Sequence, residues 1–238
     1  MKAFFYGIQI QWKIDLRNKE IFLIYYLVPL VFFGFMGGIF TSMMPGAQDT
    51  LIQSMSVFGI TMGGALGCPV ALVEHYGSDR KKAYRVGGIP LWVPFVNNLM
   101  SALIHLLLMS SVIYFVAPIA YHATVPANLF IYYLKLVLFL MVTLCVGSVI
   151  GLLVKKTSKV SVFGQFIFLP SVMISGVMFP SSYLPEPLRI VGKVFPATWG
   201  YHLLTVDNIP LNDILALIII LIISLILIML LLRKARKN

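Results

Sequence analysis

The sequence predicts an all-helical integral membrane protein with six transmembrane helices. Of its 238 residues, 60% are hydrophobic and only 11% are charged, and the mean hydropathy is +0.95. So few charged residues could not cover the surface of a soluble domain of this size. Several apolar runs are long enough to cross about 30 Å of hydrocarbon at about 1.5 Å per residue. Basic residues lie between and beside these runs, and they give the spans an orientation.

The chain is expected to form one transmembrane domain, residues 1–238, in which polar turns separate the spans. The approximate limits of the six spans are 21–41, 51–73, 91–120, 129–154, 160–178 and 211–232. Glycines recur at four-residue spacing in three of them: Gly34 and Gly38, Gly59, Gly63 and Gly67, and Gly147 and Gly151. This spacing puts the glycines on one face, where another helix can approach closely. Packing within one chain is the simpler interpretation, and a dimer seam is the alternative.

Residues 1–19 precede the first long apolar run, and we expect them to form a helix in the membrane interface. Phe5, Ile8, Trp12 and Leu16 fit one face of a helix. The same stretch also alternates between apolar and polar residues, so periodicity alone fits a strand as well. A basic segment with aromatic residues beside a span favours the interfacial helix, and a solvated tail is the alternative. The mixed composition does not predict a cleavable signal peptide.

The basic residues predict that both termini are cytoplasmic. In this topology 15 of the 18 Lys and Arg residues lie at the cytoplasmic ends of the spans. The exceptions are Lys135, Arg189 and Lys193. The reversed topology would place most of the positive charge outside, against the usual distribution of Lys and Arg. The net charge of +10 is therefore better explained by membrane topology than by nucleic-acid binding.

Residues 74–90, EHYGSDRKKAYRVGGIP, form the longest polar run and connect the second span to the third. Its charged residues are Glu74, Asp79, Arg80, Lys81, Lys82 and Arg85. A basic loop between two spans belongs on the cytoplasmic side. Topology and contact with lipid phosphates explain such a loop without any more specific role.

Residues 179–210 contain five prolines and are neither a clean span nor a clean loop. Four apolar residues at helical spacing predict a short amphipathic helix: Leu184, Leu188, Val191 and Phe195. Pro185 suits its first turn, and Pro196 is expected to stop it. We expect this helix to dip into the outer leaflet as a re-entrant segment, followed by a second short piece near residues 199–206.

The sequence carries no motif for covalent chemistry. There is no phosphate-binding GxxxxGK[ST] loop, no HExxH and no GxSxG. Cys68 and Cys145 fall inside spans and are interpreted as small buried hydrophobic residues rather than metal ligands. None of the eight Asp and Glu residues lies in the middle of a span, and His105 is expected to bond a neighbouring helix. Energy for uphill transport would therefore come from outside the chain, and no cofactor or metal is expected on it.

Uncharged polar residues in two spans are candidates for a translocation path. They are Gln53, Ser56 and Thr61 in the second span and Gln165, Ser171 and Ser175 in the fifth. Such residues could line a route for a bulky amphipathic substrate. They could equally be hydrogen-bonding residues between helices, each worth about 1 kcal/mol. The sequence leaves both interpretations open.

Two stretches resemble the ABC-2 type permeases, the membrane subunits of type-2 ABC exporters. The loop between the second and third spans resembles the E-x-x-G…P segment of this family. Glu74, Gly77 and Pro90 occupy the matching positions, and Ser78 replaces the usual Thr. The order of the spans and the N-terminal segment also agree.

The second resemblance lies after the fifth span, where the family has a proline-containing outer-side signature. Pro180, Leu184, Pro185 and Pro196 fit this signature. Neither motif alone is as specific as a nucleotide-binding loop, but together and in this order they are fairly specific. The resemblance covers nearly the whole chain.

The resemblance implies a permease subunit in the plasma membrane of a bacterium. Two such chains, identical or homologous, would bind two copies of an ABC ATPase, which would hold ATP and Mg. The ATPase-coupling loop would comprise Glu74, Gly77, Arg80, Lys81, Arg85 and Pro90. The outer-side gate would comprise Pro180, Leu184, Pro185 and Pro196. The substrate expected is an amphipathic drug, antibiotic or peptide, as in multidrug resistance.

Three alternatives remain open at the level of sequence. The same mechanism could export a lipid-linked glycan. The same fold could serve a membrane sensor or assembly factor that transports nothing. A membrane enzyme acting on lipid head groups would have to use His105, His122 or His202.

Overall fold

In the part of the chain that it describes, the computed structural model is helical throughout its secondary structure, and six of the helices there are long and apolar enough to cross a membrane. It describes residues 2–44, 46–77, 80–154, 156–208 and 210–237. The six candidate spans are Lys19–Met43, Leu51–Tyr76, Trp92–Tyr121, Leu129–Leu153, Thr157–Ile174 and Leu211–Arg236. The predicted fold class is confirmed, and most predicted limits lie within a few residues of these.

The elements, in chain order, are the following. They are α1 (Lys2–Arg17), α2 (Lys19–Phe22), the π-helix η1 (Leu23–Leu27), α3 (Val28–Met43), the 3-10 helix η2 (Ala47–Asp49), α4 (Leu51–Met62), the π-helix η3 (Gly63–Gly67), α5 (Cys68–Tyr76), α6 (Arg80–Val86), α7 (Trp92–Tyr121), α8 (Leu129–Leu153), α9 (Thr157–Ile174), the 3-10 helix η4 (Ser181–Tyr183), α10 (Glu186–Gly192), α11 (Pro196–Thr205) and α12 (Leu211–Lys237).

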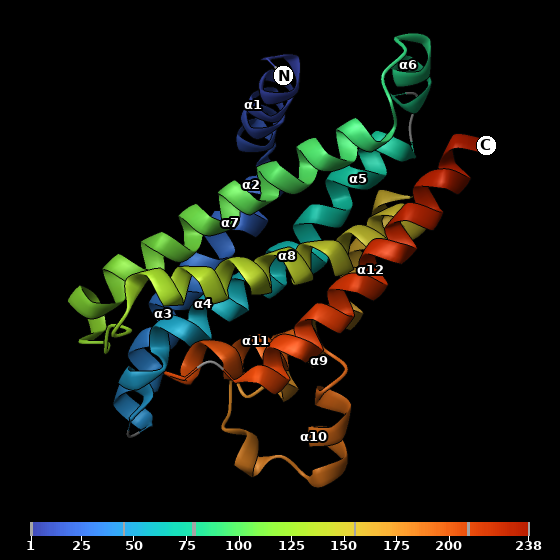
Figure 1. Cartoon of the computed structure of the whole chain (residues 1–238). Helices are drawn as coiled ribbons and strands as arrows, with labels where there is room; N and C mark the ends of the chain where they lie inside the picture. Colours follow the sequence, from blue (N-terminus) through green and yellow to red (C-terminus); the bar gives the residue numbers. More distant parts are fainter. Residues whose placement is uncertain (1, 45, 78–79, 155, 209, 238) are drawn as a thin grey trace.

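The second span, built from α4, η3 and α5, forms the centre of the bundle. In its most apolar window 94% of the residues are buried, against 28% in the first and fifth spans and 17% in the last. Helices α3, α7, α8 and α9 pack around it, and α12 packs along α8. In Figure 1 the N-terminus, α6 and the C-terminus lie at one end of the bundle, and α10 lies at the other. The weakly buried spans leave large apolar faces for lipid or for another chain.

Two prolines explain why the first and second spans each contain a turn of π-helix. Pro29 and Pro69 have no N–H to donate to the carbonyl four residues earlier. The residue before each proline donates instead five residues back, from Val28 to Leu23 and from Cys68 to Gly63. The wider turns η1 and η3 lie against each other. Both spans therefore remain continuous across a proline, as π-bulges allow.

The close approach predicted for the glycines of the second span is confirmed. A Cβ added at Gly59 or Gly63 would collide with side chains of α7, and one at Gly67 would collide with the ring of Tyr25. Gly147 packs even more closely, because a Cβ there would collide with the backbone of Gly64. These contacts lie within one chain, which supports the simpler interpretation for these glycines.

The fifth span ends earlier than predicted, at Ile174 rather than near residue 178. Gly176 has φ +94°, a left-handed conformation that suits glycine and turns the chain out of the helix. The outer segment also differs in detail from the prediction. Helix α10 ends at Gly192, and Pro196 begins α11 rather than stopping the first helix. Proline is favoured there because the first turn of a helix does not use its N–H groups.

Candidate functional site

The polar loop after the second span contains the short helix α6, at the same end of the bundle as both termini (Figure 1). Three contacts tie it and its flanking residues to the ends of spans. The hydroxyl of Tyr84 hydrogen-bonds Nδ1 of His75 at 2.9 Å, which links α6 to α5. The hydroxyl of Tyr76 donates to the carbonyl of Leu91, just before α7. A displacement of α6 would therefore reach α5 directly, and α7 through the bond between Tyr76 and Leu91.

Arg85 supplies the third contact, with the last helix. Its guanidinium donates to the carbonyls of Ala235 at 2.9 Å and Arg236 at 3.0 Å. The last carbonyls of a helix have no partner within the helix, and a cation there is also favoured by the helix dipole. The side chain therefore fastens α6 to the end of α12.

The remaining predicted coupling residues lie around this helix. Arg80 donates to the carboxylate of Glu74 at 3.2 Å across the loop. The N–H of Gly77 closes the last turn of α5 by donating to Val73 at 2.7 Å. Pro90 is exposed, and its carbonyl accepts from Val93 at 2.9 Å where α7 begins. Ser78 and Asp79 lie outside the described residues.

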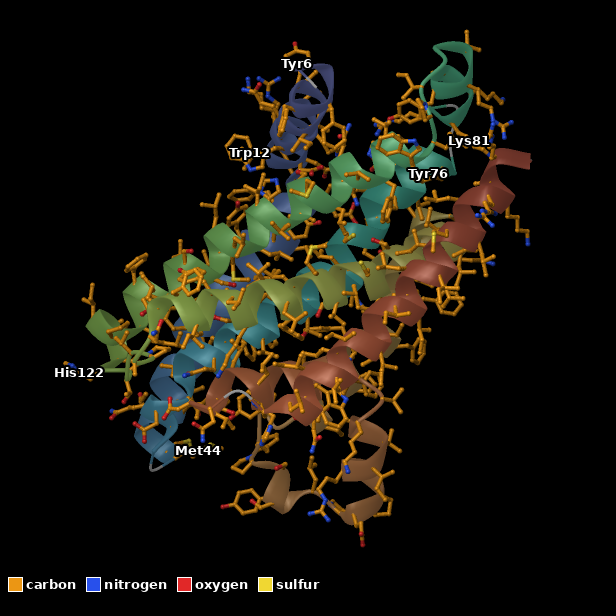
Figure 2. All side chains as sticks on the ribbon, in the orientation of Figure 1. Tyr6, Trp12, Met44, Tyr76, Lys81 and His122 are labelled. Carbon is orange, nitrogen blue, oxygen red and sulfur yellow. The ribbon has the colours of Figure 1, made fainter. Side chains whose placement is uncertain are left out.

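Lys81 borders a pocket of about 310 Å³ between the ends of the second, fourth and sixth spans. Tyr76, Gly77 and Lys234 also line this pocket. Figure 2 shows Tyr76 and Lys81 at the end of the bundle near the C-terminus, and Met44 and His122 far from them. The six residues predicted for the coupling loop thus lie at one end of the molecule.

Helix α6 also presents apolar surface to its surroundings. Val86 is 90% exposed, and the neighbouring Ile89 and Trp92 are also exposed. Gly88 has φ +65°, and the N–H of Ile89 donates to the carbonyl of Tyr84 at 2.8 Å, which ends the helix. An exposed apolar group on a short tethered helix is typical of a protein contact surface.

The N-terminal residues form the predicted helix, α1, and this helix packs against α7. Its buried residues include Gln11 and Asp15, whereas Phe5 and Leu16 from the predicted apolar face are exposed. Trp12 of the same predicted face stacks on the ring of His105, so only part of the face, at Phe5 and Leu16, points away from the core. In a membrane protein this is where lipid contact is expected, because lipid and core are equally apolar.

Asp15 is the centre of a buried polar cluster that the sequence analysis missed. It is 2% exposed and accepts hydrogen bonds from Ser101 at 2.5 Å and Gln11 at 2.8 Å. Burial raises the pKa of its carboxyl to about 6, although the two donors act in the opposite direction. The cluster joins α1 to the middle of α7.

His105 completes the cluster and bonds a neighbouring helix, as predicted. Its Nδ1 shares a hydrogen bond of 2.8 Å with the hydroxyl of Tyr26, and its Nε2 lies 4.0 Å from the carboxylate of Asp15. The ring stacks on Trp12 at 5.9 Å and on Tyr25 at 5.4 Å between centroids. These contacts connect α1, the π-turn of the first span and α7.

Most of the six candidate path residues make local contacts in the interior. Thr61 donates to the carbonyl of Val57 at 2.7 Å, and Ser171 and Ser175 likewise bond carbonyls of their own helix. Ser56 bonds the hydroxyl of Tyr132 on α8 at 3.1 Å. These bonds fit the hydrogen-bonding interpretation of the hydroxyl residues within one chain.

The two glutamines among the candidates have different surroundings. Gln165 is exposed on α9. Gln53 lines a pocket of about 310 Å³ beside Tyr132 and Lys135, and its buried Oε1 has no hydrogen-bond partner among the residues that the structure describes. An unpaired buried amide oxygen is costly, so it identifies Gln53 as the best-placed of the six to meet a ligand or water.

The four predicted gate residues lie at the turns of the outer segment. Pro180 precedes η4, and Leu184 and Pro185 lie between η4 and α10. Pro196 begins α11, which is packed among α4, α8 and α12. Pro180 also borders a pocket of about 140 Å³ with Gly176 and Tyr201. The prolines therefore set the start of each short element.

Comparison with known families decides the class of the protein. A family model described as ABC-2 type transporter matches residues 2–207. The chain belongs to the ABC-2 type transporter family. A search of curated proteins found no match. The protein is thus the permease component of an ABC transporter, a multi-pass membrane protein that is not itself catalytic, and membership implies association with an ABC ATPase component.

In this permease the histidines considered for a lipid enzyme lie in three separate places. His105 is inside α7, His122 follows the end of α7, and His202 lies in α11 beside Asp213 at 2.5 Å. Among the described residues no group of three or more His, Cys, Asp and Glu side chains is placed to hold a metal ion. The histidines thus have separate surroundings.

Lys135 is a second residue of the permease that sequence reasoning did not assign. It lies in the fourth span and is buried, with its ammonium donating to the carbonyls of Val206 at 2.6 Å and Asn208 at 3.1 Å. It therefore holds the end of α11 and the connection to α12. A lone lysine within an apolar span was the available signal, because such a residue needs a polar partner.

Proposed function

We propose that this chain is the permease subunit of an ATP-driven exporter in a bacterial plasma membrane. Its substrate is an amphipathic drug, antibiotic or peptide, moved by alternating access. The observation that carries the proposal is the attachment of α6 to α5 through Tyr84 and to α12 through Arg85, together with the bond from Tyr76 to Leu91 that ties the end of α5 to the start of α7. A helix held in this way can pass a rigid-body movement to the bundle.

In this proposal the ATPase docks on α6 and on the exposed apolar residues beside it. Two ATPase subunits bind ATP and Mg at their own interface and approach each other when both are loaded. Their movement displaces α6, and the contacts of Tyr84 and Arg85 pass the displacement to α5 and α12. The chain itself makes and breaks no covalent bond.

The proposal includes a second permease chain, identical or homologous. Helices α3 and α9 have outward apolar faces that a partner could cover, with Phe35 on α3 and Phe166 on α9 among the most exposed. Gly34, the residue before Phe35, is also exposed, and a Cβ there would meet nothing within 4 Å. Gln165 of α9 is exposed beside Phe166, so a path between two chains would present an amide to the substrate.

The outer segment closes the path in this proposal. Helix α11 lies inside the bundle and α10 lies at its edge, joined to α11 through Gly192 and Thr198 at 2.6 Å. Pro180, Leu184, Pro185 and Pro196 fix the turns of this segment. Outward opening would move the two short helices as a unit.

The experiment that tests the proposal is purification of the tagged chain from its native cells in a gentle detergent. The mass of the complex and its ATPase rate are measured, and transport is then followed in vesicles with active and hydrolysis-dead ATPase. We expect two permeases with two ATPases and transport that needs hydrolysis. A lone or dimeric chain without ATPase, even after cross-linking through α6, contradicts the proposal and favours a sensor or assembly factor. Movement of a lipid-linked glycan in place of an amphipathic drug would correct the substrate class only.

A further inference from the structure

A large apolar pocket opens where α8 ends and α9 begins. Its volume is about 570 Å³, within the range of about 300–1,000 Å³ that is usual for small-molecule sites. The residues that line it are Ile150, Leu153, Val154, Lys156, Lys159, Phe163 and Ile167. This pocket includes none of the coupling, path or gate residues discussed above.

The pocket combines apolar walls with a positively charged edge. Five of its lining residues are aliphatic or aromatic, and the other two are lysines. Lys156 and Lys159 are exposed and lie at the first turn of α9, so their ammonium groups stand at one end of the apolar surface. None of the residues that line this pocket is acidic. The pocket is therefore built for a molecule with an apolar body and an anionic end.

The position of the pocket identifies the kind of molecule. It lies at the boundary between spans and loop, at the end of the bundle that also carries α6 and the C-terminus, because Leu153 and Val154 line the neighbouring pocket with Lys81 and Lys234. Leu153 and Phe163 are more than half exposed, so the pocket faces the membrane. At this depth lysine side chains extend toward phosphate groups while their stems stay in apolar surroundings.

We propose that this pocket binds one anionic phospholipid. Its phosphate lies between Lys156 and Lys159, and one acyl chain lies along Phe163 and Ile167. Basic pockets between transmembrane helices at the cytoplasmic face bind anionic lipid head groups in this manner. The site is separate from the ATPase surface on α6, and it does not depend on the direction of transport.

The geometry of α9 favours a lipid over a second copy of the chain. Phe163 and Ile167 lie one helical turn apart on one side of α9. Val162, Phe166, Leu169 and Met173 form a different exposed stripe on the same helix. A partner chain that covers this second stripe leaves the pocket and its two lysines open to lipid.

Native mass spectrometry of the purified full-length chain tests the proposal. The chain in neutral detergent is titrated with phosphatidylglycerol, with phosphatidylcholine of the same acyl chains, and with inorganic phosphate. We expect one phosphatidylglycerol to be retained at least fivefold more than phosphatidylcholine, and no retained inorganic phosphate. Equal retention of the two lipids, or retention of free phosphate, overturns the proposal, and this comparison needs no variant.

Variants then locate the site. The pair Lys156→Gln with Lys159→Gln is expected to lower phosphatidylglycerol retention at least fivefold, and Ile167→Trp is expected to do the same by filling the pocket. The matched control is Lys13→Gln with Lys19→Gln, which removes the same charge from exposed positions near the N-terminus. Retention that is unchanged in the first pair, or equally reduced in the control pair, shows that phosphatidylglycerol does not bind at α9 and overturns the assignment. If the mass of a dimer appears as bound lipid is lost, a second chain and not a lipid occupies the pocket.

Discussion

Burial and hydrogen bonding shift the pKa of the Asp15 carboxyl group in opposite directions. Burial raises its pKa to about 6 from an ordinary value of 3.8, so the folded state holds the proton more tightly than the unfolded chain. Its contribution to stability is therefore fully present below about 3.8 and is lost as the pH rises through about 6. Because Asp15 joins α1 to α7, this loss should weaken the packing of the N-terminal helix against α7.

Asp15→Asn is expected to remove this pH dependence. Asn keeps an oxygen that can accept a hydrogen bond and carries no charge, so the variant should match the native chain near pH 4 and exceed it near pH 8. The two pKa values differ by about two units, which corresponds to roughly 3 kcal/mol. Thermal unfolding of the purified chain at pH 4.5, 6 and 8 measures the effect. If the unfolding temperatures of the native chain and the variant change with pH in the same way, this account of Asp15 is wrong.

Lys135 gives a second prediction for a single residue. Lys135→Met keeps the apolar stem but leaves the carbonyls of Val206 and Asn208 without their donor. We expect a loss of about 1–3 kcal/mol in stability, as is usual for buried acceptors that lose their partners. Thermal unfolding checks this, with the exposed Lys193→Met as control. A loss of the same size in the control would count against a specific role for Lys135.

Helix α6 allows a prediction at the scale of one element. Arg85→Gln weakens its attachment to α12, and Tyr84→Phe removes its hydrogen bond to His75. If α6 passes movement to the bundle, each variant should still purify with the ATPase, while stimulation of ATP hydrolysis by substrate should fall several-fold. The ATPase rate of the complex with and without substrate measures this coupling. Arg189→Gln, at the other end of the molecule, is the control. Loss of the complex itself would show that the residues serve assembly rather than coupling.

Gly147 and Gly34 differ in how closely other residues surround them, and the effect of this difference on stability can be measured. A Cβ at Gly147 would collide with the backbone of Gly64, whereas a Cβ at Gly34 would meet nothing within 4 Å. Gly147→Ala should therefore destabilise the chain by about 1–3 kcal/mol, the usual cost of overpacking. Gly34→Ala should cost nothing in the isolated chain, since alanine also has the higher helix propensity. Thermal unfolding of the two variants in detergent distinguishes them, and equal losses would mean that Gly34 is also packed.

The spans were predictable because length and hydropathy fix them almost alone, and the glycines of the second span were predictable because their spacing is regular. The packing side of α1 was predictable only in part. Trp12 of the predicted apolar face packs on His105, but Phe5 and Leu16 are exposed and the polar residues Gln11 and Asp15 are buried. Nothing local in the sequence connects Asp15 with Ser101 and His105, which lie far along the chain. The early end of α9 depends on the left-handed backbone conformation of Gly176, which a hydropathy profile does not reveal.

At the scale of the whole molecule, the exposed faces of the spans determine how a second chain could join. Helix α4 is fully covered within one chain, whereas α3, α9 and α12 are not. Helix α12 is apolar on nearly every side, which suits lipid. Helices α3 and α9 add Gly34 and Gln165 to their apolar faces, and these two residues favour contact with protein over contact with lipid.

Cysteine cross-linking tests this assignment in native membranes. The chain's own Cys68 and Cys145 are buried, so single cysteines can be introduced with little background. Phe166→Cys on α9 is expected to give a disulfide-linked dimer under mild oxidation, because the same residue of the partner would lie near the seam. Ile222→Cys on α12, at an exposed site that faces lipid in this arrangement, should stay monomeric. The opposite result would place the seam at α12, and the path would then not run beside Gln165.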